Sequence, residues 1–119
     1  MTVRRLETAD GRVIAGQVEV ADTVWKRFVG LMGRPELPAG HGLYLQPCGS
    51  IHMFFMRFPI DAVFVGGDGA IVRIYAAIRP WRVTGIVRKA KACIELPAGT
   101  AAAQQLNVGH VVRLSQEPA

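Results

Sequence analysis

The chain has 119 residues, a formal net charge of +5 and a hydrophobic fraction of 50%. This length and hydrophobic content predict a single folded domain over residues 1–119 and exclude an intrinsically disordered protein. No apolar run reaches the roughly 18 residues that a membrane-spanning helix requires, and the N-terminus lacks the apolar core of a secretory signal. We therefore expect a cytoplasmic protein with no membrane partner.

The N-terminal part of the chain predicts two strands followed by a helix. Val3–Leu6 and Val13–Val20 are typical of strands around a turn at Ala9–Gly11. Asp22 is a favourable N-cap for a helix over Thr23–Met32, which Gly33 would end. The expected inward face of this helix consists of apolar side chains, with Trp25 at its margin: Val24, Phe28, Leu31 and Met32.

The rest of the chain alternates short strands with turns. Gly66–Gly69 is a hairpin signal, and Thr100 is expected to cap a short helix that ends near Leu106. The expected strands are Leu43–Leu45, Ile60–Val65, Ile71–Ile78, Ala90–Leu96 and Val111–Leu114, before a frayed tail over Gln116–Ala119. This pattern predicts an α+β fold, a mainly antiparallel sheet curled into a small barrel-like structure with one covering helix and one short helix.

The segment Ile51–Val65 is the most informative part of the sequence. It reads I-H-M-F-F-M-R-F-P-I-D-A-V-F-V, so it is apolar enough for a core, yet it carries His52, Arg57 and Asp61. Unpartnered charges are costly in an apolar setting, so we expect these three side chains to approach one concave site beside the core. The predicted ligand-binding residues are His52, Phe54, Met56, Arg57 and Asp61.

Each polar residue of this segment has a structural alternative. His52 is suited to act as a base, a donor or a metal ligand, but backbone groups can also satisfy both of its nitrogens. Arg57 can clamp an anion at two points or form a buried ion pair with Asp61. Asp61 can instead be satisfied by backbone amides. Walls of Met and Phe side chains suit a ligand with an apolar body and a polar handle.

Metal and nucleophile motifs are weak in this sequence. His41, Cys48 and His52 could supply three zinc ligands, but no C-x-x-C or H-x-x-x-H pair reinforces them, so we predict no metal and no cofactor. Cys48 and Ser50 lie near His52 but not on a nucleophile elbow, and phosphate-binding glycine motifs are absent. We interpret Cys93 as a small packed residue and Cys48 as a loop thiol.

Residues 79–91 form a basic segment with no acidic residue. It contains Arg79, Arg82, Arg88, Lys89 and Lys91, with Trp81 among them. Such a segment can hold phosphates and stack a base. We favour a solvated, peripheral loop instead, because Trp81 is its one aromatic residue and single-strand platforms usually need several.

Several short motifs occur in a specific order between Val13 and Leu114. They are Arg27, Gly30-Leu31-Met32, Arg34, Gly42-Leu43, the run H-M-F-F-M-R-F-P-I-D at 52–61, and Leu96-Pro97-Ala98-Gly99. This order resembles the bacterial and archaeal family called domain of unknown function 192. The resemblance implies a small, mainly β, barrel-like domain without an established activity. Gly109-His110 departs from the glycine and aspartate usual in the family, which leaves any role of that carboxylate open.

The sequence thus leaves three functions to separate. We favour the binding of a small, anionic ligand, with Arg57 as the anion anchor and His52 and Asp61 as polar contacts. The second is a small hydrolase or lyase that uses His52 and Asp61 as an acid-base pair. The third is an interaction module that grips nucleic acid or an acidic partner through residues 79–91.

Overall fold

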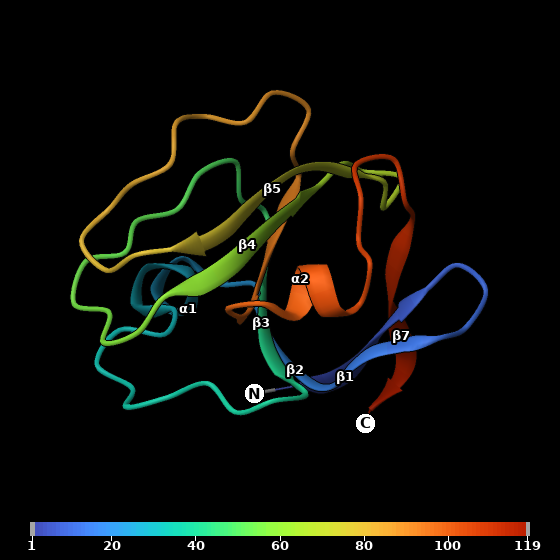
Figure 1. The fold of residues 1–119 in the computed structure, drawn as a ribbon, viewed down its shortest axis with the longest axis horizontal. Helices are drawn as coiled ribbons and strands as arrows, with labels where there is room; N and C mark the ends of the chain where they lie inside the picture. Colours follow the sequence, from blue (N-terminus) through green and yellow to red (C-terminus); the bar gives the residue numbers. More distant parts are fainter. Residues whose placement is uncertain (1, 119) are drawn as a thin grey trace.

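The computed structural model describes residues 2–118, within which seven strands and two helices are found (Figure 1). This composition confirms the predicted α+β class. In chain order the elements are β1 (Val3–Thr8), β2 (Val13–Ala21), α1 (Val24–Val29), β3 (His41–Leu45), β4 (Ile60–Val65), β5 (Ile71–Ile78), β6 (Ala92–Pro97), α2 (Thr100–Ala103) and β7 (Val112–Pro118).

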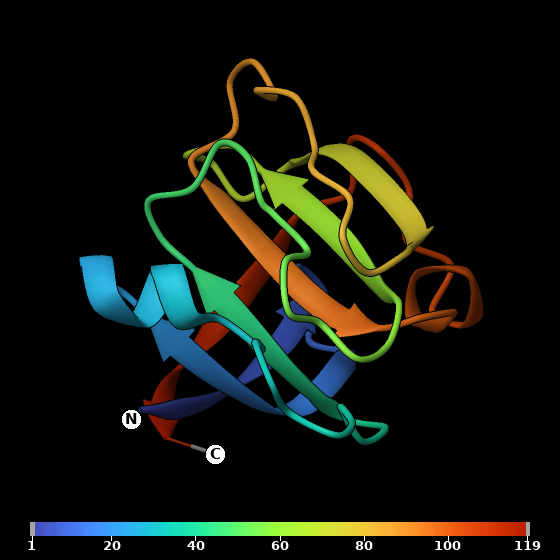
Figure 2. The ribbon, with the colours of Figure 1, turned by 90° about the vertical axis from the view of Figure 1, so that its left-hand side faces the viewer.

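All seven strands belong to one sheet with the order β5-β4-β6-β3-β2-β1-β7. Neighbouring strands are antiparallel except for β2 and β3, which are parallel from Gln17 opposite His41 to Ala21 opposite Leu45. A parallel pair cannot be joined by a tight turn, so the chain must cross over between these two strands. That crossover contains α1, which places the helix beside the ends of β2 and β3 (Figure 2).

The sheet is strongly bent, so that β4 and β5 lie over the half that contains β1, β2 and β7 (Figure 1). Its two edge strands, β5 and β7, approach each other only at one end. There an isolated bridge joins Ala70 and Val111, and Val112 N donates to Gly69 O at 3.0 Å. Because no continuous ladder links β5 to β7, the sheet is not closed, and the barrel-like part of the prediction is not confirmed.

The apolar core forms two clusters on opposite faces of β4 and β6. Alternation along β4 places Ile60, Ala62 and Phe64 in one cluster, with Val63 and Val65 in the other. Every residue of β4 is buried, which matches a central strand covered on both faces. The cluster around Phe64 also receives Met53 and Met56 from the segment before β4, and it forms the base of the candidate site.

Helix α1 differs from the predicted helix in its start and its length. Its N-cap is Thr23 rather than Asp22, because the Thr23 hydroxyl accepts a hydrogen bond from Lys26 N at 3.1 Å. The helix ends after Val29, where Gly30 adopts a φ of 49° and donates its N–H to Lys26 O.

The predicted inward face of this helix is wrong for Val24 and Phe28 and correct for Leu31. Val24, Trp25 and Phe28 are 75%, 71% and 57% exposed, and no residue of α1 is buried. Leu31, in the turn that follows, supplies the apolar side chain that enters the core. A helix of six residues is too short to present a full apolar stripe, so α1 projects from the sheet rather than covering it.

Two further corrections concern the C-terminal part of the chain. Gly99, with a φ of 94°, is the N-cap of α2 in place of Thr100, and the helix ends at Ala103 rather than near Leu106. Strand β7 continues to Pro118, so Gln116–Pro118 belong to a strand instead of a frayed tail, while Ala119 lies outside the described residues. None of the helices within residues 2–118 has the length and apolar character needed to cross a bilayer.

Candidate functional site

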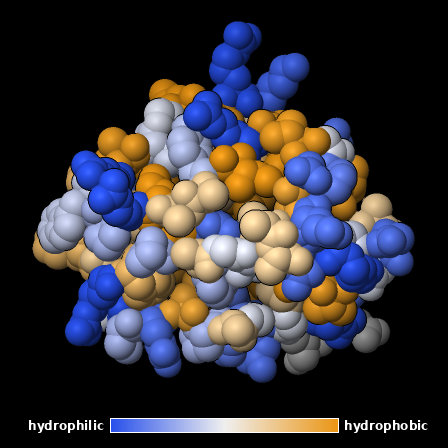
Figure 3. Space-filling model, viewed as in Figure 1, coloured by the Kyte–Doolittle hydropathy of each residue, from blue (hydrophilic) through white to orange (hydrophobic). Residues whose placement is uncertain are grey.

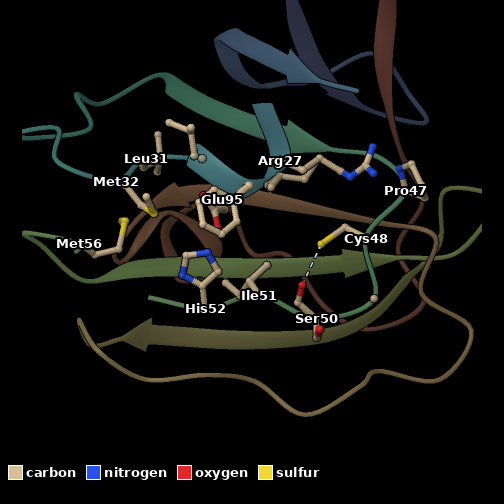
Figure 4. Close-up of a pocket in the computed structure, with 15 residues that line it drawn as sticks. Arg27, Leu31, Met32, Pro47, Cys48, Ser50, Ile51, His52, Met56 and Glu95 are labelled. Atoms are coloured by element: carbon tan, nitrogen blue, oxygen red, sulfur yellow. Dashed lines mark hydrogen bonds between the residues drawn. The ribbon is translucent and has the colours of Figure 1, made fainter. Parts of the chain in front are cut away.

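A cavity of ≈ 300 Å³ lies between α1, the turn after it and the segment that follows β3 (Figure 4). Its lining consists mostly of apolar and small residues, with Arg27, Cys48, His52 and Glu95 as the groups that can carry charge. The remaining lining residues are Phe28, Val29, Gly30, Leu31, Met32, Leu45, Pro47, Gly49, Ser50, Ile51 and Met56. A volume at the lower end of the range for ligand pockets, ~300–1,000 Å³, fits a small ligand.

Glu95 is a buried carboxyl group that faces this cavity. Alternation along β6 turns Cys93 and Glu95 toward the cluster around Phe64, while Ile94 and Leu96 enter the other cluster. The residue is 4% exposed, and its Oε1 has no hydrogen-bond partner within the part of the chain that the structure describes. In Figure 4 Glu95 lies among the lining residues that come from α1 and from the segment after β3.

Burial is the main reason that the pKa of Glu95 rises to about 8. The nearby Cys48 raises this pKa further, whereas the charge of Arg34 lowers it. Glu95 is therefore largely a neutral carboxylic acid at pH 7. In this form it offers one O–H donor to a bound group.

Cys48 lines the same cavity and has the opposite shift. A hydrogen bond with the Cys93 thiol is the largest cause that lowers the pKa of Cys48 to about 7, and the charge of Arg27 contributes, while burial opposes the shift. The Cys48 Sγ lies 3.1 Å from the Ser50 carbonyl oxygen. Cys93 is 0% exposed, which confirms it as a packed residue, and burial raises the pKa of its thiol.

Two of the five predicted ligand-binding residues, His52 and Met56, line the cavity. His52 Nδ1 accepts a hydrogen bond from Phe54 N at 3.2 Å, so the histidine is partly satisfied by its own loop. The His52 ring lies between Phe28 and Phe54, with centroid distances of 5.9 and 5.0 Å. Phe54 itself does not line the cavity and is 42% exposed.

Asp61 does not reach the cavity, which corrects the predicted meeting of His52, Arg57 and Asp61. It is the residue after Ile60 in β4, so alternation turns it to the opposite face of the strand. Its carboxylate there accepts three backbone hydrogen bonds, from Ala77 N at 2.8 Å, Gly99 N at 3.1 Å and Ala101 N at 2.9 Å.

Arg57 is exposed and does not line the cavity either. Within residues 2–118 no ion pair joins it to Asp61. The carboxylate of Asp61 is occupied by the start of α2 and by β5, so the acid-base pair of His52 and Asp61 has no geometric support.

The three residues considered as zinc ligands are not gathered at one point. Cys48 and His52 line the cavity, whereas His41 begins β3 and does not. Residues 2–118 contain no cluster of three or more His, Cys, Asp or Glu side chains that could hold a metal ion.

The residue that the sequence interpretation missed is Glu95. Its signal was present, because the run Ala92–Leu96 reads A-C-I-E-L and contains one ionisable carboxyl group within a strand-like apolar stretch. A charged residue inside such a strand requires a partner or a change of protonation state. The helical spacing that predicts Val24 and Phe28 on the inner face predicts Arg27 on the outer face, whereas the structure places it at the same cavity.

Comparisons with known proteins agree with the fold described above. Residues 5–114 match the family described as DUF192, "Uncharacterized ACR". A UPF0127 protein of Pyrococcus furiosus is 33% identical over 109 residues, which cover 87% of this chain and 91% of that protein. A UPF0127 protein of Thermococcus sibiricus is 39% identical over 94 residues; the match covers 75% of this chain but only 60% of the relative's length.

Two solved structures have the same architecture. A protein from Sinorhizobium meliloti 1021, named as a proposed transcription regulator, has a TM-score of 0.82 and 28% identity, with 96% of this chain and 94% of that chain covered. A protein of unknown function from Novosphingobium aromaticivorans has a TM-score of 0.80 and 26% identity, with 93% and 83% covered. The match over residues 5–114 and the Pyrococcus relative show that this chain belongs to the uncharacterised DUF192 (UPF0127) family.

Proposed function

We propose that the protein binds a small ligand with an apolar body and a carboxylate head in the cavity beside α1. The observation that carries this proposal is Glu95, a buried carboxyl group with an unpartnered oxygen at the cavity. Buried polar atoms in folded proteins normally have a partner, so an unpartnered one that faces a cavity favours a ligand as the partner. The apolar part of the lining provides the surface that the ligand body would cover.

The charges at the cavity favour a carboxylate over an amine. Near pH 6.5 Glu95 is neutral because its pKa is about 8, and the Cys48 thiol, with a pKa of about 7, is mostly neutral, whereas the guanidinium of Arg27 keeps its positive charge. A carboxylate would accept a hydrogen bond from the Glu95 acid. The positive charge of Arg27, whose Nη1 donates to the Asp22 and Gln46 carbonyl oxygens at 3.3 and 3.4 Å, would attract it at the same cavity. In this proposal Arg27 takes the anchoring role first expected of Arg57, and His52 and Met56 contact the ligand body.

The test is isothermal titration calorimetry with octanoate as the probe and octylamine as its matched control. Octanoate is expected to bind at about pH 6.5 and to lose affinity above about pH 8, where both Glu95 and the Cys48 thiol are ionised and repel the head. Octylamine should bind more weakly than octanoate at the lower pH, because Arg27 repels it. Octanoate affinity that is absent, or that stays constant between these pH values, would contradict the proposal.

Three variants separate the contributions of Glu95 and Arg27 to octanoate binding. Glu95→Leu removes the donor and should weaken octanoate binding about tenfold or more, whereas Glu95→Gln keeps an N–H donor and should retain binding with a smaller loss above pH 8, the remainder coming from the Cys48 thiolate. Arg27→Met should weaken binding about tenfold. The matched control is Arg12→Met, which removes a guanidinium that is hydrogen-bonded to Gln104, far from the cavity, and should leave affinity unchanged.

A further inference from the structure

Six aromatic rings form a continuous chain across the end of the molecule that carries α1. We call this set, Trp25, Phe28, His52, Phe54, Phe55 and Trp81, the aromatic surface. Successive ring centroids lie 5.0 to 6.1 Å apart, from Trp25 through Phe28, His52, Phe54 and Trp81 to Phe55. Trp25, Phe55 and Trp81 are 71%, 61% and 59% exposed, so the rings face solvent rather than the core.

The aromatic surface comes from three segments that the backbone ties together. Met53 N donates to Arg82 O at 2.7 Å, and Trp81 N donates to Met53 O at 2.8 Å. Gly33 N donates to Phe55 O at 3.0 Å, which links the turn after α1 to the same place. The rings are therefore held side by side in a preformed arrangement.

Two of the aromatic residues have a strained backbone conformation. Phe55 and Trp81 have φ angles of 61° and 68°, in the left-handed region that bulky residues avoid. Neither ring gains burial from this conformation, because both remain exposed. Strain of this kind persists where the surrounding structure imposes it, and it is concentrated at binding sites.

Three exposed aliphatic side chains belong to the same segments of the chain as the rings. Val24 precedes Trp25 in α1, while Val83 and Ile86 follow Trp81; their exposed fractions are 75%, 61% and 86%. Over the loop between β5 and β6, at the upper left of the view, Figure 3 shows hydrophobic and strongly hydrophilic side chains intermixed. Isolated exposed apolar residues are common, but the linked exposed rings, with Val83 bridged to His52, indicate an interaction surface.

Within the three segments that carry the aromatic surface, the charged side chains are all cationic, while the exposed Asp22 lies just before the first of them. Residues 24–29, 52–58 and 79–89 contain no Asp or Glu. They contain seven cationic residues, which are Lys26, Arg27, Arg57, Arg79, Arg82, Arg88 and Lys89. A protruding apolar surface surrounded by cations is complementary to a surface that is anionic outside and apolar beneath.

We propose that the aromatic surface docks on a bilayer that contains anionic lipids. Tryptophan and phenylalanine partition into the interfacial layer, Val24, Val83 and Ile86 would enter the acyl boundary, and the seven cations would contact the headgroups. Single-stranded nucleic acid would use the rings and the cations, but bases gain little from three protruding aliphatic side chains. This inference does not depend on a ligand in the cavity.

The chain offers an intrinsic reporter for the test, because both of its tryptophans, Trp25 and Trp81, belong to the aromatic surface. The protein is titrated with phosphatidylcholine vesicles, with and without about one-third phosphatidylglycerol. Tryptophan emission is expected to shift to shorter wavelength with the anionic vesicles, and the protein should co-sediment with them. Affinity should fall with added salt.

Two matched pairs of variants locate the contact. Val83→Ser with Ile86→Ser should weaken vesicle binding about tenfold or more, whereas Val13→Ser with Val108→Ser, also exposed but outside the three segments, should not. Arg82→Gln with Arg88→Gln should weaken it about tenfold or more, and Arg12→Gln with Arg113→Gln should weaken it less. Thermal unfolding of each variant checks that the fold is retained.

A parallel titration with oligothymidine tests whether the aromatic surface binds single-stranded nucleic acid instead of a bilayer. Tryptophan quenching by oligothymidine at concentrations where anionic vesicles produce no shift would assign the aromatic surface to nucleic acid and overturn the proposal. Equal binding to the neutral and anionic vesicles, absence of binding to both, or equal losses in the test and control variants would also overturn it.

Discussion

Asp61 and Glu95 are buried carboxyl groups on neighbouring strands, and their surroundings give them different roles. Asp61 accepts three backbone N–H groups and thereby joins β4 to β5 and to the start of α2. Glu95 has an oxygen without a partner and lies at a cavity. A carboxylate that is fully hydrogen-bonded to backbone stabilises the fold, whereas an unsatisfied carboxyl group lowers stability and is available to a ligand.

Replacing Asp61 is therefore expected to destabilise the fold strongly. Asp61→Ala leaves one buried and two partly buried N–H groups without their acceptor and should lower the free energy of unfolding by about 2 kcal/mol or more. Urea denaturation measures the change. Glu36→Ala, an exposed acidic residue in the loop before β3, is the control and should change it by less than about 0.5 kcal/mol. An Asp61→Ala variant as stable as this control would refute the structural role.

Replacing Glu95, in contrast to Asp61, is expected to stabilise the fold, and only at high pH. Its pKa is about 8 in the folded protein and near the ordinary 4.5 in the unfolded chain, so folding is favoured by the protonated form. This contribution is complete below about pH 4.5, declines as the pH rises, and is lost above about pH 8. Glu95→Gln cannot ionise. It should match the natural protein near pH 4.5 and exceed it above pH 8.

Thermal unfolding at the two pH values measures this effect. Above pH 8 the melting temperature of Glu95→Gln should be higher than that of the natural protein by about 4 °C or more. Glu36→Gln, whose side chain is exposed, should show no such pH-dependent difference. A constant offset between Glu95→Gln and the natural protein at both pH values would show that Glu95 is ionised in the folded state.

At the scale of the elements, one glycine marks the approach of the two edges of the sheet. A Cβ at Gly69 would lie 2.6 Å from the Val112 carbonyl oxygen, and the φ of Gly69 is +84°. Gly11 has a similar φ of +92°, but a Cβ there would meet no atom within 4 Å. The two positions therefore share backbone strain and differ in steric contact.

Gly69→Ala should destabilise the protein more than Gly11→Ala. Both variants lose about 1 kcal/mol to the left-handed backbone. Gly69→Ala should lose about 1–3 kcal/mol more, because the added methyl group pushes Val112 away from β5. Urea unfolding of the two variants provides the comparison, and equal losses would show that the edges do not meet closely at Gly69.

The strands and the positions of both helices were largely predictable from the sequence, whereas the lengths of the helices and the burial of α1 were not. The buried strand at 60–65 and its hairpin partner at 71–78 have strong apolar and turn signals, and both occur as predicted. Helix α1 was predicted too long and too buried, because Val24, Trp25 and Phe28 have a helical spacing that is typical of a core face. Its exposed apolar residues instead form part of the aromatic surface.

The candidate site was predictable only in part, because some of its residues are distant from one another in the sequence. His52 and Met56 were found because polar and apolar residues mix in one short segment. Glu95 and Arg27 are 43 and 25 positions away from His52 in the sequence. Only the pairing of β6 with β3 and the crossover through α1 bring them to the same cavity.

In the whole molecule, the cavity and the aromatic surface lie at one end, and the contact between the two sheet edges lies toward the other. The cavity and the aromatic surface share Phe28 and His52, so the proposed ligand site opens within the proposed membrane-docking surface. The turn at Gly69 and the contact between β5 and β7 lie toward the other end. The basic loop, first interpreted as a solvated surface with one aromatic residue, meets Phe54 and Phe55 in the folded protein.

The central claim is that Glu95 is a neutral acid held ready for a ligand in the cavity. The most direct measurement is a carbon-detected NMR titration of the side-chain carboxyl groups in protein labelled at glutamate, with Glu95→Gln to assign the signal. Glu95 should titrate with a midpoint near pH 8, which should move upward when octanoate is present because the bound head stabilises the protonated form. A midpoint near pH 4.5 that does not respond to octanoate would contradict the account.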